Sequence, residues 1–141
     1  MSTVHRLTDL YLTGSGRIGR QAFFFGVLPL AAAWTALTLL APKAPDWVER
    51  GLAAALLYLA ACVTAQRLHD RGRAGWWAGP LLLAVVLAWM WRETPFGWAL
   101  GVLLLAPLFD LVVKPGQAGF NRYGPSPKGS GSREYQAPSA D

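Results

Sequence analysis

The stretch from Ala22 to Ala41, AFFFGVLPLAAAWTALTLLA, decides the fold, because none of its 20 residues carries a charge. At a rise of 1.5 Å per residue, about 20 apolar residues span a hydrocarbon layer of about 30 Å. Secretory signal peptides have a shorter apolar region of about 7–15 residues, and 21 residues precede this stretch. We therefore expect a membrane-spanning helix that stays in the mature protein.

Three further apolar blocks follow it: Gly51 to Ala65, Trp76 to Trp91 and Phe96 to Val113. The four blocks contain 69 of the 141 residues, and the longest remaining segment has 28 residues. A segment of that length is too short to fold as a separate soluble domain. The sequence thus predicts an all-α integral membrane bundle with four membrane segments, at about residues 22–41, 47–71, 76–91 and 96–113.

The ends of the last three segments are marked by turn and capping residues. Asp46 and Glu49 have the spacing of a capping box, and Gly72 is a typical helix stop, so the second segment is predicted over about 47–71. Blocks three and four are separated only by the charged turn RETP at 92–95, which predicts a tight helical hairpin. A 16-residue third block leaves open whether this hairpin crosses the membrane or re-enters on the same side.

A soluble helical core is the alternative to a membrane bundle, and the composition disfavours it. Charged residues make up 15% of the chain, compared with roughly 25% in soluble domains. Three of the four blocks have almost no polar face, which a soluble surface helix needs. Six of the seven tryptophans lie at block ends, where membrane proteins place amphipathic rings: Trp47, Trp76, Trp77, Trp89, Trp91 and Trp98.

The distribution of basic residues predicts the orientation. Ten of the 13 lie before the first block, between the second and third, or after the fourth, and Lys43, Arg50 and Arg92 lie on the other side. Because short loops rich in Lys and Arg stay in the cytoplasm, we expect residues 1–21 and 114–141 to be cytoplasmic. Residues 114–141 are expected to form a turn-rich motif and a tail that is disordered beyond about Pro127.

The candidate functional residues centre on the loop QRLHDRGRAGWW at 66–77. Guanidinium groups match the geometry of phosphate, so this loop is the best anion-binding candidate. Adjacent His69 and Asp70 do not face each other on a helix, so no catalytic dyad is expected, and Asp70 is predicted to pair with Arg67. The full anion-binding or lipid-binding candidate set is Arg17, Arg20, Arg67, His69, Asp70, Arg71, Arg73, Asn121 and Arg122.

Other chemistry-bearing residues give weaker signals. Asp110 is the acid inside an apolar block, and Lys114 one turn later predicts an ion pair, with a proton or cation pathway as the alternative. Cys62, His5 and His69 share no ligand spacing, so neither a metal nor another cofactor is expected. No nucleophile stands beside a base, so we expect no enzyme. The basic residues form no free stripe, which disfavours nucleic acid as a partner.

Three motifs together resemble one family: GRIGRQAFFFG at 16–26, QRLHDRGRAGWW at 66–77 and GFNRYGPSP at 119–127. They resemble the small bacterial inner-membrane proteins catalogued as domain of unknown function 805, the YhaH-like group. The resemblance covers about residues 14–127. This chain has Phe24 and Phe25 where the family usually has an aromatic pair that contains tryptophan or tyrosine. It implies a multi-pass protein of the bacterial plasma (inner) membrane and no established activity.

We therefore expect a non-enzymatic membrane module whose cytoplasmic arginine cluster binds anionic phospholipid headgroups or an acidic partner. The alternative is a small oligomeric transporter or channel subunit in which Asp110 and His69 relay protons. Gly97 and Gly101 form a GxxxG pattern that permits close packing within the bundle, in a homo-oligomer or with a membrane-protein partner.

Overall fold

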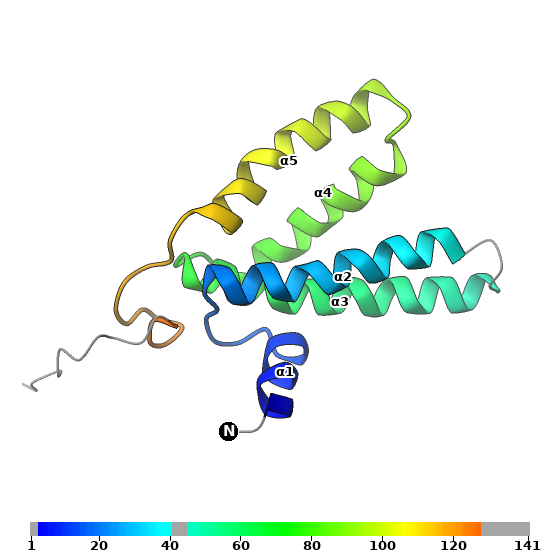
Figure 1. Cartoon of the computed structure of the whole chain (residues 1–141). Helices are drawn as coiled ribbons and strands as arrows, with labels where there is room; N and C mark the ends of the chain where they lie inside the picture. The colour runs from blue at the N-terminus through cyan, green and yellow to red at the C-terminus, as the bar shows by residue number, and fades with distance from the viewer. Residues whose placement is uncertain (1–2, 41–44, 128–141) are drawn as a thin grey trace, which may run out of the picture.

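The computed structural model describes residues 3–40 and 45–127, and regular structure within these ranges is helical, apart from one isolated β-bridge. The prediction of an all-α fold is therefore confirmed for the described residues. The predicted disorder of the tail falls on residues 128–141, which lie outside them, as does Lys43. The elements are α1 (Thr3–Leu12), α2 (Arg20–Leu40), α3 (Asp46–Asp70), the 3₁₀ turn η2 (Gly75–Trp77), α4 (Ala78–Met90) and α5 (Pro95–Val113) (Figure 1).

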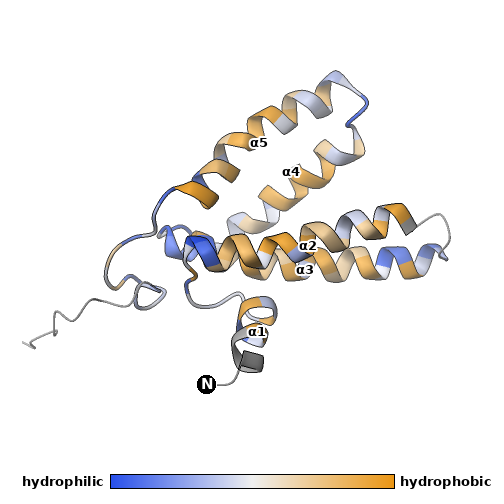
Figure 2. Cartoon of the chain, in the orientation of Figure 1, coloured by the Kyte–Doolittle hydropathy of each residue, from blue (hydrophilic) through white to orange (hydrophobic). Residues whose placement is uncertain are grey.

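Three of these helices, α2, α3 and α5, are long and apolar enough to cross a membrane. At most 22% of the residues in the most apolar window of each helix are buried inside the protein. Apolar residues run along these helices in Figure 2. An apolar surface of this kind needs a solvent other than water, so the helices are those expected of a multi-pass membrane protein.

The helix α3 begins one residue earlier than predicted and without the predicted capping box. Its N-cap is Pro45, and no side chain caps the first turn. Asp46 instead pairs with Arg50 at 3.2 Å, one turn along the exposed helix surface. The predicted stop at Gly72 is confirmed, because Gly72 has a φ of 71°, in the left-handed region that glycine tolerates.

A short turn joins α4 to α5, and the two helices lie side by side (Figure 1). Thr94 is the N-cap of α5, and its hydroxyl accepts a hydrogen bond from the Gly97 amide at 3.3 Å. A Cβ atom at Gly97 would collide with the backbone carbonyl of Trp91, whereas one at Gly101 would meet open space. Within this chain, the turn before α5 therefore requires the small residue Gly97, whereas the described residues leave room for a side chain at Gly101.

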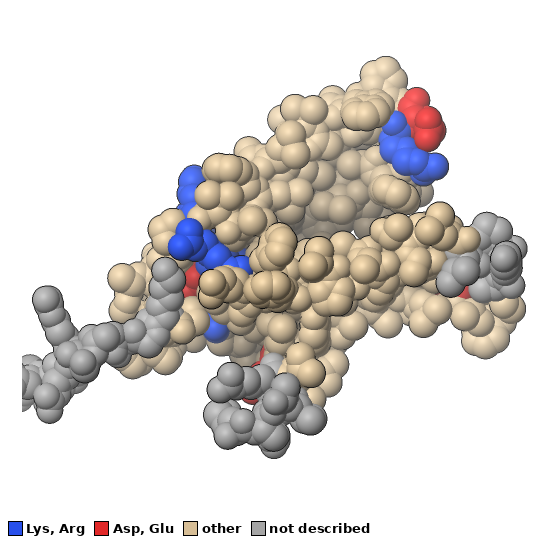
Figure 3. Space-filling model, in the orientation of Figure 1, with Lys and Arg blue, Asp and Glu red and all other residues tan. Residues whose placement is uncertain are grey.

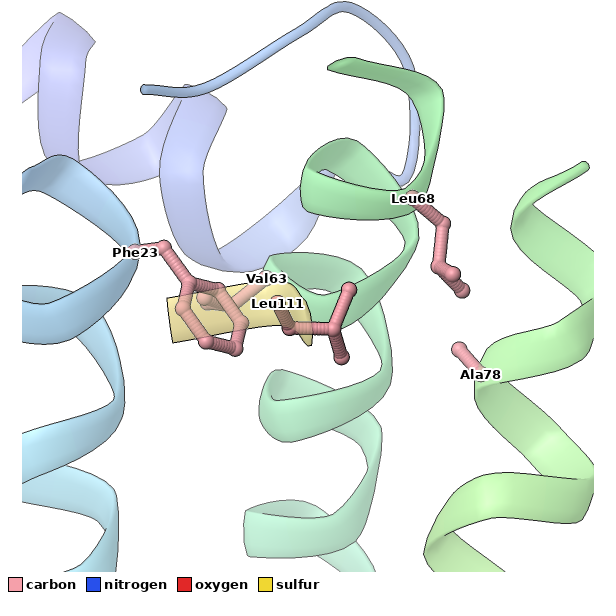
Figure 4. Close-up of a cluster of buried hydrophobic side chains, with 5 residues drawn as sticks. All are labelled: Phe23, Val63, Leu68, Ala78 and Leu111. Atoms are coloured by element: carbon pink, nitrogen blue, oxygen red, sulfur yellow. The ribbon is translucent and has the colours of Figure 1, made fainter. Parts of the chain in front are cut away.

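The buried apolar cluster joins four helices near one end of the bundle. Phe23 comes from α2, Val63 and Leu68 from α3, Ala78 from α4 and Leu111 from α5 (Figure 4). In Figure 1 the α2–α3 pair and the α4–α5 pair meet at this end and diverge toward the other. The core therefore lies where α2 begins and where α3 and α5 end, next to the polar residues described below.

The helix α1 lies across α3 and was not predicted from the sequence (Figure 1). The Tyr58 hydroxyl donates a hydrogen bond to the carbonyl of Leu12 at 3.1 Å. The Tyr11 hydroxyl donates to the carbonyl of Gly26 at 3.1 Å, and Leu10 packs against the buried cluster. Both tyrosines thus link α1 to the membrane-length helices, so residues 3–12 belong to the folded unit.

Candidate functional site

Polar side chains gather where α2 begins and where α3 and α5 end, and we call this region the basic end. It brings together the loop before α2, the turn after α3 and the segment after α5, which are far apart in the sequence. Figure 3 shows Lys and Arg side chains gathered at this end of the molecule. Its charged side chains are Arg17, Arg20, Arg67, Arg71, Arg73, Lys114 and Arg122, with the carboxylates of Asp70 and Asp110.

Asp70 holds two guanidinium groups, and we call Arg17, Arg67 and Asp70 the buried hub. The Oδ1 atom of Asp70 accepts hydrogen bonds from Arg17 Nε at 3.2 Å and Nη2 at 3.0 Å, and Oδ2 accepts one from Arg67 Nη1. The three side chains are between 0% and 3% exposed. The predicted pair of Arg67 with Asp70 is confirmed, and the second partner, Arg17, was not predicted.

Arg17 links all three segments of the basic end. Besides its two bonds to Asp70, it donates to the carbonyls of Gly119 at 2.8 Å, Gly124 at 3.0 Å and Gln117. A guanidinium group has five N–H donors, so every donor of Arg17 is already engaged. The predicted anion-binding residue Arg17 thus has no donor free for an external phosphate in this arrangement.

Arg67 satisfies the carboxyl end of α5. Its Nε donates to the Leu111 carbonyl at 2.7 Å, its Nη2 to the Lys114 carbonyl at 2.6 Å and its Nη1 to the Ile18 carbonyl at 3.4 Å. The last four carbonyls of a helix have no partner within the helix, and a cation there is favoured by the helix dipole. Arg20 makes a similar contact, donating to the Val113 carbonyl at 2.8 Å.

A second charged cluster surrounds Asp110. Lys114 Nζ lies 2.7 Å from its Oδ1 atom, which confirms the predicted ion pair, and Arg71 Nη2 lies 3.2 Å from the same atom. Arg73 approaches the other carboxylate oxygen at 4.0 Å. The side chains of Arg73 and Lys114 are 57% and 56% exposed, respectively. Three cations therefore share one carboxylate, which leaves an excess of positive charge at the surface.

His69 and Asp70 have different neighbours. The His69 ring stacks on Tyr123, with centroids 3.8 Å apart and planes at 11°, and its Nδ1 atom lies 3.1 Å from the Gly16 carbonyl. The Arg122 guanidinium lies 4.7 Å from the centroid of Tyr123. Among residues 3–40 and 45–127, no hydrogen bond joins the side chains of His69 and Asp70. The arrangement therefore lacks the geometry of an acid–base dyad.

Two glutamines and an asparagine complete the backbone connections of the site. The Gln66 side chain, in a residue 3% exposed, donates to the carbonyls of Asp9 at 2.8 Å, Leu10 at 3.1 Å and Thr13. The backbone N–H of Gln117 donates to the Asp70 carbonyl at 2.8 Å. Asn121, one of the predicted candidates, donates to the His69 carbonyl at 3.0 Å and to Gln117 Oε1 at 3.1 Å.

The two glutamines were missed by the sequence analysis. Gln66 follows a run of apolar residues in α3, and a buried amide needs hydrogen-bond partners. The position of Gln66 after an apolar run could therefore have predicted a structural role for its side chain. It does not show which groups accept its hydrogen bonds. Gln117 lies in an irregular segment after α5, where the sequence holds no comparable signal.

Five residues of the predicted anion-binding set fall into two groups, and the other four, His69, Arg71, Asn121 and Arg122, make the contacts described above. Arg17, Arg67 and Asp70 are buried and hold backbone segments together. Arg20 and Arg73 are exposed, and Lys114, outside that set, adds a third exposed cation. Within the part of the chain that the structure describes, no three His, Cys, Asp or Glu side chains gather to hold a metal ion. The exposed cations are the groups of this site that are able to bind an anion.

The comparisons with known proteins agree with the motifs that meet at the basic end. The family described as "Protein of unknown function (DUF805)" matches residues 11–125. The chain is similar to "Uncharacterized protein YiiR" of Escherichia coli strain K12, with 37% identity over 121 residues that cover 77% of this chain and 82% of the relative. The protein of the same name from Escherichia coli O157:H7 matches equally well. No solved structure matches the chain.

The space beside Asp70 gives a test of the buried hub. A Cβ atom at Gly116 would collide with the Asp70 carboxylate, so Gly116→Ala should displace the anion from its two guanidinium groups. Removing the partner of a buried charge costs about 3–5 kcal/mol, and we expect a destabilisation close to the lower end of this range. Cys62 is the single cysteine and is buried, so labelling of its thiol during heating in detergent reports unfolding.

The matched control is Gly14→Ala, because a Cβ atom at Gly14 meets nothing within 4 Å. We expect this variant to unfold at the wild-type temperature. Equal unfolding temperatures for the Gly116 and Gly14 variants would contradict the importance of the hub.

Proposed function

We propose that this chain, which belongs to the DUF805 family of proteins of unknown function, is a bacterial inner-membrane protein whose basic end binds anionic lipid headgroups at the cytoplasmic surface. The observation that carries the proposal is the charge imbalance of the basic end. There, seven basic side chains surround two carboxylates, and the exposed Arg73 and Lys114 belong to the cluster with excess positive charge. Each basic residue near an anionic membrane surface contributes about 1 kcal/mol to the free energy of binding to that surface.

The placement of aromatic residues supports a membrane location for all four apolar helices, including the short α4. Trp47 and Trp98, 76% and 72% exposed, lie near the start of α3 and of α5. Trp76 and Trp77, 63% and 51% exposed, precede α4. Such rings favour the two headgroup levels of a bilayer. With 13 residues, α4 is only about 20 Å long, so we propose that η2 and the tryptophans extend its reach.

The cytoplasmic orientation follows from the same charges. Basic loops are retained in the cytoplasm, and the basic end collects the basic residues that precede α2, follow α3 and follow α5. At the opposite end, the exposed Arg50 and Arg92 each pair with a carboxylate, so that end carries a more balanced charge.

A non-enzymatic role fits this arrangement better than a transport pathway. A relay would need Asp110 and His69 to share a path for protons. Asp110 is engaged by Lys114 and Arg71, and His69 is engaged by Gly16 and Tyr123. No hydrogen bond in the described ranges links the two side chains. Binding of an anionic surface needs no such path, so it is the function that we propose.

The orientation is tested with reporters fused to the chain in bacterial cells. Green fluorescent protein fused after Asp141 should fluoresce, and alkaline phosphatase at the same point should be inactive, because the basic end is retained inside. Phosphatase inserted after Glu93 should be active if the α4–α5 pair crosses the membrane. Active phosphatase after Asp141 would contradict the orientation, and inactive phosphatase after Glu93 would contradict the crossing.

Lipid binding is tested by native mass spectrometry of the detergent-solubilised protein with added phosphatidylglycerol. The double variant Arg73→Gln, Lys114→Gln removes two exposed charges from the basic end. At about 1 kcal/mol per charge, we expect binding to weaken by about 30-fold. The matched control Arg50→Gln, Arg92→Gln removes the same charge from the opposite end and should bind as the wild type does.

The thermal labelling of Cys62 shows whether each double variant stays folded. Unchanged phosphatidylglycerol binding by a folded Arg73→Gln, Lys114→Gln variant would defeat the proposal. Equal binding of phosphatidylcholine and phosphatidylglycerol by the wild type would defeat it as well.

A further inference from the structure

We propose that a groove between the start of α2 and the end of α5 seats one anionic phospholipid, with its phosphate on Arg20 and an acyl chain along Phe24 and Phe25. The inference rests on the proposed function and adds to it the position and orientation of a bound lipid. Three observations carry the inference: the hollow between the two helices, the absence of a carboxylate partner for Arg20 among the described residues, and the exposed apolar side chains that line the hollow. None of them involves the cluster around Asp110.

The groove is a hollow of about 740 Å³ between the two helices. This volume is within the range of about 300–1,000 Å³ that is typical of ligand pockets. Its walls come from Gly19 and the first turns of α2, from the last turn of α5 and from Pro127 in the segment after α5. The residues on which the inference depends are Arg20, Phe24, Phe25, Val112 and Val113. The groove thus lies at the basic end, beside the helices that are long enough to cross a membrane.

The polar part of the groove is Arg20. Its Nη1 atom donates one hydrogen bond, to the Val113 carbonyl at 2.8 Å, and this contact positions the guanidinium group at the groove. No carboxylate of the described residues forms an ion pair with Arg20, in contrast to Arg17 and Arg67. An arginine with free donors and no anion of its own matches a phosphate group in charge and in geometry.

The apolar part of the groove begins one turn further along α2. Phe24 and Phe25 are 50% and 68% exposed, and their rings meet edge to face with centroids 5.7 Å apart. Val112 and Val113 on the facing helix are 39% and 44% exposed. These side chains leave a large apolar surface uncovered at a hollow, and an acyl chain would cover it.

The order of these groups along α2 matches that of a phospholipid. A charged residue at position 20 precedes aromatic residues at positions 24 and 25, and α2 continues into its membrane-length stretch. A lipid with its phosphate at Arg20 would place its acyl chain against the aromatic rings in the same direction. A soluble phosphate would leave the apolar wall bare, and a neutral headgroup would leave the arginine without an anion. The groove therefore fits an anionic phospholipid.

The test compares variants of the full chain by native mass spectrometry with dioleoyl phosphatidylglycerol. Arg20→Gln should weaken binding of the first lipid by at least about tenfold, because it removes the cation that faces the phosphate. Arg20→Lys keeps the charge without the planar donors, so it should bind the lipid more tightly than Arg20→Gln and more weakly than the wild type. Arg92→Gln, an arginine in the distant α4–α5 turn, should have no effect.

The apolar wall is tested by Phe25→Ala, which should also weaken binding of the lipid. The matched control is Phe120→Ala, because Phe120 is 80% exposed and lies outside the groove. Glycerophosphoglycerol, the soluble headgroup without acyl chains, should bind far more weakly than the lipid. Equal binding of the soluble headgroup and the lipid would overturn the inference.

The same spectra separate this inference from the proposed function. If Arg20→Gln binds lipid as the wild type does while Arg73→Gln, Lys114→Gln does not, the groove is overturned and the proposed function stands. If lipid binding is lost in Arg20→Gln and Phe25→Ala but not in their controls, the groove is supported. A wild-type dimer without lipid that Phe25→Ala converts to monomer would show a second copy in the groove and overturn the lipid assignment.

Discussion

The structure of the basic end depends on one interaction, the pairing of the Asp70 carboxylate with the guanidinium groups of Arg17 and Arg67. The segments before α2 and after α5 have little regular structure, so their carbonyls need donors from elsewhere. A guanidinium group offers five donors in a fixed plane, and Asp70 offsets much of the cost of burying two of them. The space beside Gly116 allows the chain to pass close to that carboxylate. Three distant sequence motifs are thereby held in one place.

Five of the seven cations at the basic end divide between two roles. Arg17 and Arg67 are buried and donate to backbone carbonyls, so they stabilise the fold. Arg20, Arg73 and Lys114 keep exposed charge, which is available to an anionic surface. The apolar core lies at the same end of the bundle as the hub, and the contact of Arg67 with the Leu111 carbonyl joins α3 to α5 there. The buried cations and the exposed cations of the proposed lipid site therefore lie at the same end of the fold.

The sequence predicted the all-α fold well, because apolar runs of membrane length leave the backbone few alternatives to helix. It also predicted the pairs Arg67–Asp70 and Asp110–Lys114, since each pair is three or four residues apart at the end of one helix. It did not predict the partner of Asp70 in Arg17, which is 53 residues away. Long-range contacts of this kind depend on how helices end and pack, and residue spacing alone does not reveal them. The predicted capping box at Asp46 was wrong because the N-cap is Pro45, whose side chain has no hydrogen-bond acceptor for the first turn.

A double-mutant cycle between Arg17 and Asp70 tests the central claim most directly. The variants Arg17→Met, Asp70→Asn and their combination are compared by the unfolding free energy in detergent, with the thiol of Cys62 as reporter. If the two side chains form the buried hub, the double variant is less destabilised than the sum of the single variants by about 1–3 kcal/mol. The exposed pair Arg50 and Asp46, treated in the same way, should show little coupling. Additive effects at Arg17 and Asp70, within about 0.5 kcal/mol, would contradict the account.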